Sequence, residues 1–166
     1  MLTLILQDAF FSAVAAVGFS AISRPPKVAF LCSAVTAAVG HSVRFWLMNP
    51  DFGPGLHIIL ATLIGSFVVG LLAVFLSPIA GIPAETTLFP SLLPMIPGIY
   101  AYKAFGGLAM CVLSKTQDIY NFYFYQFSFN GFMTLALLLC MAVGSTLPIF
   151  FFEKIAYQAT RHRKAL

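Results

Sequence analysis

The sequence predicts an all-α integral membrane protein with five transmembrane helices, and three observations support this. First, 60% of the 166 residues are apolar and only 8% are charged, whereas soluble domains carry about a quarter charged residues. Second, five apolar runs have roughly the 20-residue length that crosses a bilayer as a helix. Third, four of the nine Lys and Arg residues lie in the last thirteen positions, which is typical of a membrane-flanking tail. This composition excludes a soluble enzyme, a nucleic-acid-binding protein and a disordered chain.

Turns rich in proline and glycine separate these runs. Residues 23–27 contain two prolines, which cannot continue a helix, and residues 49–55 form a turn cluster. The third span is expected to close at Ser77 and Pro78. We expect one transmembrane domain over residues 1–153 and a basic cytoplasmic tail over residues 154–166. The predicted spans cover residues 3–22, 28–48, 56–76, 87–113 and 131–152.

The cations in short loops predict the orientation. Arg24 and Lys27 in the first turn would share one side of the membrane with the tail, whereas Lys115 would lie on the other side with Arg44. This contrast favours an N-terminus outside the cytoplasm and a cytoplasmic C-terminus.

Three charged or titratable residues stand inside predicted spans, where such groups are costly and suggest function. Asp8 lies in the first span, and His41 and Arg44 lie three residues apart on one face of the second. Counted from the first turn, all three fall about 20–24 Å deep on adjacent antiparallel helices. Two interpretations stay open. An Asp8–Arg44 pair with His41 as a hydrogen-bonding neighbour would lock the helices together, or the cluster takes up a proton or faces an anionic substrate.

The fourth span contains three prolines, the last followed by Gly98. Prolines remove backbone donors, and non-helical backbone within a bilayer is tolerated only where it is buried or lines a wet cavity. We therefore expect a discontinuous helix that restarts after Pro97 and Gly98 with its N–H groups facing an anion. Tyr100, Tyr102 and Lys103 follow as further candidates for substrate binding. The alternative is a kinked structural helix with Lys103 extended toward the outer interface.

Other residues carry weaker signals. Residues 120–127 form an aromatic stretch expected at the membrane interface before the fifth span. Asn130 stands at the expected mouth of that span, either as a helix cap or as a substrate contact. Nothing in the sequence resembles a catalytic triad, a phosphate loop, a metal site or a cofactor site, so we expect no enzyme activity, no metal and no cofactor.

Three segments carry a resemblance to a known family. The chain resembles the threonine/serine exporter family, and more closely its small split subunit of the YjjB type. The segments are Ala16-Val17-Gly18-Phe19, Gly40-His41-Ser42-Val43-Arg44 and Leu93-Pro94-Met95-Ile96-Pro97-Gly98-Ile99-Tyr100-Ala101-Tyr102.

The resemblance implies a secondary exporter of small carboxylates in the bacterial inner membrane, with the N-terminus periplasmic. It also implies a larger partner subunit of the YjjP type and a pair associated with succinate export. The motifs make His41, Arg44, Pro97 and Gly98 site candidates, and Asp8 stands where the family-like first span carries a Gln-Asp pair. Lys103 belongs to no family motif.

If a ten-span exporter is split into halves of five, the halves insert in opposite orientations, so this chain would be half of an inverted-repeat transporter. The prediction is therefore a proton-coupled export subunit for a dicarboxylate or for threonine and serine, surrounded by membrane lipid. Two alternatives stay open: an assembly or scaffold subunit that does not transport, and a passive pore formed by a homo-oligomer.

Overall fold

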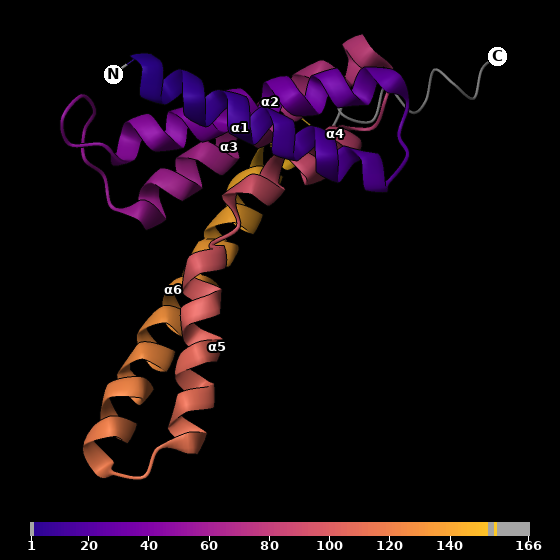
Figure 1. Cartoon of the computed structure of the whole chain (residues 1–166). Coiled ribbons are helices and arrows are strands. Elements are labelled where there is room, and N and C mark those ends of the chain that lie inside the picture. Colours follow the sequence, from indigo (N-terminus) through magenta and orange to yellow (C-terminus); the bar gives the residue numbers. More distant parts are fainter. Residues whose placement is uncertain (1, 153–154, 156–166) are drawn as a thin grey trace. The chain divides into compact units, whose positions relative to one another are not determined.

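The computed structural model describes residues 2–152 and 155, and these residues form helices with no strand (Figure 1). Four helices are long and apolar enough to cross a membrane, or five if the broken pair in the middle of the chain counts as one span. The all-α membrane fold predicted from the sequence is thus confirmed. The predicted basic tail lies outside the described residues except for Ile155.

The first two helices begin within one residue of their predicted starts and end where predicted, α1 at Leu2–Ile22 and α2 at Lys27–Met48. The third, α3, covers Ile58–Ala80 and so continues past the predicted end at Pro78. This proline lies in the last turn, and Gly81, at φ +64°, ends the helix in the left-handed conformation. The N–H of Gly81 bonds to the Ser77 carbonyl.

The last helix, α6, covers Gln117–Phe151 and begins well before the predicted start of the fifth span at residue 131. The aromatic stretch before that span is therefore part of the same helix. Its polar side chains bond within the helix: Gln117 Nε2 donates to Asn121 Oδ1 at 3.2 Å, and the Ser128 hydroxyl donates to the Phe124 carbonyl at 2.8 Å. Such local bonds let polar residues remain helical.

The chain divides into two compact units, each described by itself. Unit 1 comprises Met1–Met95 and Cys140–Leu166, and unit 2 comprises Ile96–Leu139. Unit 1 holds α1, α2, α3, the short helix α4 (Ala84–Leu92), the 3-10 turn η1 (Leu93–Met95) and the C-terminal part of α6. Unit 2 holds α5 (Gly98–Leu113) and the N-terminal part of α6.

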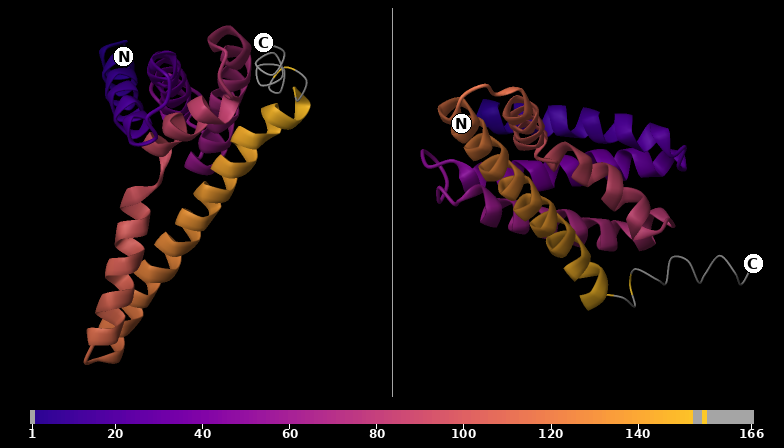
Figure 2. Two further views of the ribbon diagram at one scale, coloured as in Figure 1. Left: turned by 90° about the vertical axis from the view of Figure 1, so that its right-hand side faces the viewer. Right: turned by 90° about the horizontal axis from the view of Figure 1, so that it is seen from below.

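In unit 1, α1, α2 and α3 lie side by side, and α4 packs against α2 and α3 (Figures 1 and 2). Small residues line these contacts. Ser12 and Ala16 of α1 are buried, and the Ser12 hydroxyl lies 3.5 Å from the Ala37 carbonyl of α2. Small side chains allow helix backbones to approach closely inside a membrane bundle.

Glycines mark the closest helix approaches in unit 1. A Cβ at Gly65 of α3 would lie 2.9 Å from Arg44 Cβ and 3.2 Å from the Gly40 carbonyl of α2. A Cβ at Gly144 of α6 would overlap the Ser66 hydroxyl of α3. These positions admit no side chain without a shift of one helix.

In unit 2, α5 and the first part of α6 form an antiparallel pair joined by the turn 114–116 (Figure 2). Gly107 of α5 brings the two backbones together, because a Cβ there would lie 2.8 Å from the Phe127 nitrogen. Gly106, beside it, has open space around the position of its missing Cβ.

Candidate functional site

The polar cluster predicted on the first two spans includes an ion pair. His41 Nδ1 of α2 lies 2.7 Å from Asp8 Oδ2 of α1, and the two side chains are 22% and 20% exposed. The two residues meet because their helices are antiparallel neighbours and because they lie at equal depth from the first turn. At this distance the imidazole and the carboxylate share one hydrogen bond.

Arg44 lies one turn beyond His41 on α2 and contacts the end of η1. Its Nη1 donates to the Met95 carbonyl oxygen at 3.2 Å. The sequence reasoning expected an Asp8–Arg44 pair with His41 beside it. The structure instead records the contact between Asp8 and His41, and an Asp8–Arg44 contact stays a prediction.

A hydroxyl fixes α4 against the same helix. Ser91 Oγ is buried and lies 3.0 Å from the Ser33 carbonyl of α2 and 2.7 Å from the Thr87 carbonyl of its own helix. The bond from Arg44 to Met95 and the contact from Ser91 to Ser33 therefore hold α4 and η1 against α2 at two positions along that helix.

The break predicted in the fourth span is confirmed. The helix α4 ends at Leu92, η1 ends at Met95, and α5 begins at Gly98 with Pro97 as its N-cap. Pro97 has φ −76° and ψ +59°, the conformation of an inverse γ-turn.

This turn gives a hydrogen-bond partner to one of the N–H groups at the start of α5 that the sequence reasoning expected to face an anion. The Gly98 N–H donates to the Ile96 carbonyl at 2.8 Å. The next two N–H groups, of Ile99 and Tyr100, have no hydrogen-bond partner among the described residues. These two donors, rather than that of Gly98, face outward from the start of α5.

Two of the other predicted candidates, Tyr100 and Asn130, lie outside both the ion pair and the pocket linings. Tyr100 is half-buried on α5. Asn130 does not cap a helix, because it lies inside α6, where it is 4% exposed. Its Nδ2 donates to the Gln126 backbone carbonyl at 2.6 Å and to Gln126 Oε1 at 3.1 Å. Asn130 therefore orients Gln126.

Lys103 and Tyr102 line a pocket of about 340 Å³ within unit 2, between α5 and α6. Sequence reasoning missed two of its polar members, Tyr123 and Gln126, because the stretch around them was interpreted as an interfacial belt. Their spacing of three would have placed both on one helical face if that stretch had been predicted as helix. The remaining lining residues are Gly106, Gly107, Met110 and Phe122.

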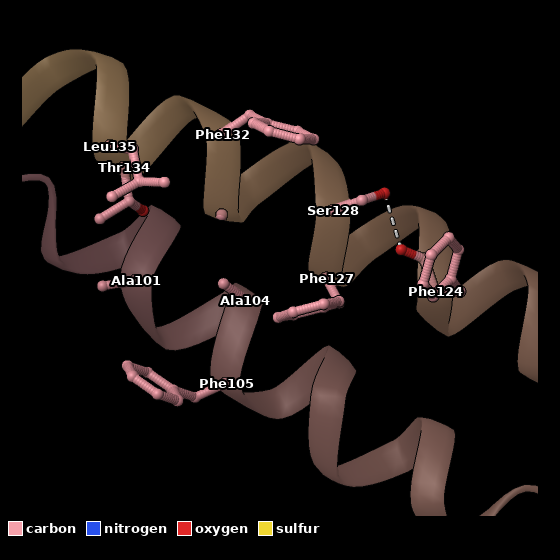
Figure 3. Close-up of a pocket in the computed structure, with 10 residues that line it drawn as sticks. Ala101, Ala104, Phe105, Phe124, Phe127, Ser128, Phe132, Thr134 and Leu135 are labelled. Carbon is pink, nitrogen blue, oxygen red and sulfur yellow. Dashed lines mark hydrogen bonds between the residues drawn. The ribbon is translucent and has the colours of Figure 1, made fainter.

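A second groove in the same unit, of about 440 Å³, has a different character (Figure 3). Aromatic rings and small apolar side chains line it, including Ala104, Phe105 and Phe132. Figure 3 shows the Ser128 hydroxyl bonded to the Phe124 carbonyl oxygen, so this polar group is satisfied by its own helix. This groove offers no charge to a polar solute.

Four buried hydroxyls of unit 1 were also missed. Their oxygens have no partner among the described residues, and they belong to Ser20 of α1, Ser33 and Thr36 of α2 and Thr62 of α3. The sequence signal, small polar residues at helical spacing, could not be distinguished from simple helix packing. Across residues 2–152, no three His, Cys, Asp or Glu side chains gather closely enough to hold a metal ion.

Membrane-spanning helices, an ion pair within them and a broken span together describe a polytopic membrane protein. The chain belongs to the threonine/serine exporter family, whose model, described as "Threonine/Serine exporter, ThrE", matches residues 8–151. Its family and its candidate membrane spans make it a membrane protein.

One relative, an uncharacterised protein of Haemophilus influenzae, is 35% identical to this chain over 100 residues. The match covers 60% of this chain but 32% of the relative, so the chain spans about a third of the relative's length. No solved structure matches this chain.

Proposed function

We propose that this chain is one subunit of a proton-coupled secondary exporter of small carboxylates, either a dicarboxylate such as succinate or the amino acids threonine and serine. Family membership supports the export role. The observation that carries the coupling is the Asp8–His41 pair, held at 2.7 Å inside two membrane-spanning helices. Titratable groups within membrane spans are costly to keep, and by default they suggest function.

The pair and its neighbour Arg44 can change their net charge by one proton at a time. With Asp8 ionised and His41 neutral, the three side chains carry no net charge. One proton on the imidazole gives the cluster one positive charge, and a second proton, on the carboxylate, gives it two. A positive cluster in a low-dielectric setting attracts an anion strongly, so proton uptake and carboxylate binding favour each other.

The break in the fourth span is proposed to bind the substrate carboxylate. The N–H groups of Ile99 and Tyr100 lack partners among the described residues, and they stand at the positive end of the α5 dipole. Pro97 and Gly98 shape the turn that leaves these donors open. The cluster and the break thus have separate tasks, one for the proton and one for the cargo.

A larger membrane partner subunit is proposed to complete the transporter in the bacterial inner membrane, with the N-terminus of this chain periplasmic and its C-terminus cytoplasmic. The length of the relative supports this, because about two thirds of that protein lies outside the matched region. In an inverted-repeat arrangement, the partner would supply the half inserted in the opposite direction.

The test is flux in proteoliposomes that contain the chain with its co-purified partner. We expect efflux of labelled succinate or threonine to rise with an imposed pH gradient. Asp8→Asn should abolish the dependence on the gradient, because an amide cannot exchange a proton with His41. Asp51→Asn, in an exposed loop, is the matched control and should transport as the wild type does.

Three results would contradict this proposal. Unchanged pH dependence in Asp8→Asn would remove the coupling role. Full transport by the partner alone would make this chain a scaffold. Flux that is indifferent to the gradient in the wild type would indicate a passive pore.

A further inference from the structure

Lys103 is the only charged residue of α5. It lies ten residues before the end of that helix at Leu113, which is about 15 Å along the axis. Its ammonium has no hydrogen bond or ion pair with any of the described residues. A cation placed this far along an apolar helix needs a counter-charge or a wet cavity.

An open pocket lies beside Lys103, whose side chain is exposed. Two adjacent glycines of α5 produce it: Gly107 lets α6 approach the α5 backbone, and Gly106 leaves open space where a side chain would stand. The pocket lies entirely within unit 2 and has a volume of about 340 Å³. This volume is at the lower end of the range for small-molecule sites.

The polar groups around Lys103 are oriented to donate hydrogen bonds. Asn130 Nδ2 donates to a backbone carbonyl, so this atom must belong to the NH₂ end of the amide. The Gln126 atom that it also contacts must then be an oxygen, which leaves the Gln126 NH₂ group for another acceptor. Tyr102 and Tyr123 add phenolic hydroxyls to the same pocket.

No acidic side chain lines this pocket. One ammonium, one oriented amide and two phenols can all donate to the acceptor oxygens of an anion, and no carboxylate is present to pair with an ammonium group. The apolar groove in the same unit shows that this chemistry is specific to the Lys103 side.

We propose that the α5–α6 pair carries its own anion site at Lys103, separate from the break, which takes a carboxylate or phosphate oxygen. Lys103 supplies the positive charge. Gln126, positioned by Asn130, donates a hydrogen bond that orients the anion. The choice of succinate as the probe rests on the proposed export function. The alternative source of the same chemistry is the phosphate of an anionic lipid headgroup.

The experiment measures how fast a water-soluble acetylating reagent modifies lysines in the full chain, purified into nanodiscs of zwitterionic phosphatidylcholine, which has no net charge. Peptide mass spectrometry reports Lys103 and, as an internal control, Lys115 in the neighbouring turn. We expect succinate to slow acetylation of Lys103 severalfold and to leave Lys115 unchanged. Gln126→Leu should raise the half-protecting succinate concentration by roughly tenfold or more. Gln117→Leu, at a glutamine of α6 outside the pocket, should not.

A second arm uses nanodiscs that contain phosphatidylglycerol. Protection of Lys103 by this lipid without succinate supports the site and assigns its anion to a headgroup. Equal acetylation of Lys103 under all conditions overturns the site. Acetylation needs no transport, so the two proposals can fail separately. If succinate protects Lys103 but the proteoliposomes show no flux, the anion site stands and the export function is contradicted. If the proteoliposomes show flux but no anion protects Lys103, only the anion site is contradicted.

Discussion

Replacing Gly65 by alanine tests whether the contact between α2 and α3 fixes the backbone that carries Arg44. The new methyl group would lie 2.9 Å from Arg44 Cβ and 3.2 Å from the Gly40 carbonyl. Neither atom is the free end of a flexible side chain, so the two helices must move apart by several tenths of an ångström.

Two opposing terms set the size of the effect. Overpacking of this kind costs about 1–3 kcal/mol, while alanine is favoured over glycine inside a helix by about 1 kcal/mol. We expect Gly65→Ala to destabilise unit 1 by about 0–2 kcal/mol. Gly18→Ala is the matched control, because it lies in a helix of the same unit with nothing within 4 Å of the new methyl group. It should stabilise by up to about 1 kcal/mol.

The assay is unfolding of the purified chain by sodium dodecyl sulfate in mild-detergent micelles. Trp46, the only tryptophan, lies on α2 two residues after Arg44 and serves as the fluorescent reporter. The comparison of the two variants cancels the helix-propensity term. If Gly65→Ala stabilises the protein as much as Gly18→Ala does, the close approach of α2 and α3 is refuted.

Three further predictions follow from the same contacts. Pro97→Ala restores a backbone donor at the break and should lower proteoliposome flux while leaving the protein folded; undiminished flux would contradict the role of the break. Ser91→Ala removes the hydroxyl that contacts the Ser33 and Thr87 carbonyls and should cost about 0.6–1.7 kcal/mol in the detergent titration, whereas Thr146→Ala, whose hydroxyl bonds only within α6, should change little. Gly144→Leu should abolish folding, measured by size-exclusion chromatography, because α3 occupies that space, and Gly131→Leu should fold normally because its surroundings are open.

Much of this fold follows from local properties of the sequence. Apolar length predicts α1 and α2 almost to the residue, because crossing a bilayer requires a fixed number of helical turns. The break at Pro97 and Gly98 was also predictable, since a proline ring removes a donor wherever it stands. Equal depth on neighbouring helices brought Asp8 and His41 to one level, but the ion pair expected there was between Asp8 and Arg44.

The remaining features depend on tertiary packing. Helical periodicity places Arg44 on a face but does not identify Met95, 51 residues away, as its partner. The early start of α6 was missed because aromatic and amide residues are typical of both interfaces and helices. The pocket at Lys103 was missed in part for the same reason, because Tyr123 and Gln126 lie on that early turn of α6.

The two covalent connections between the units differ in stiffness. At Ile96 and Pro97 the chain crosses the boundary between units without a helical hydrogen bond to lose, since proline has no N–H. Between Leu139 and Cys140 it crosses the same boundary inside the unbroken helix α6. A bend at the first crossing therefore costs little, whereas one at the second must rupture backbone bonds. Relative motion of the two units would therefore bend the chain at residues 96–97 more readily than at residues 139–140. The backbone hydrogen bonds of α6 would limit the size of that motion.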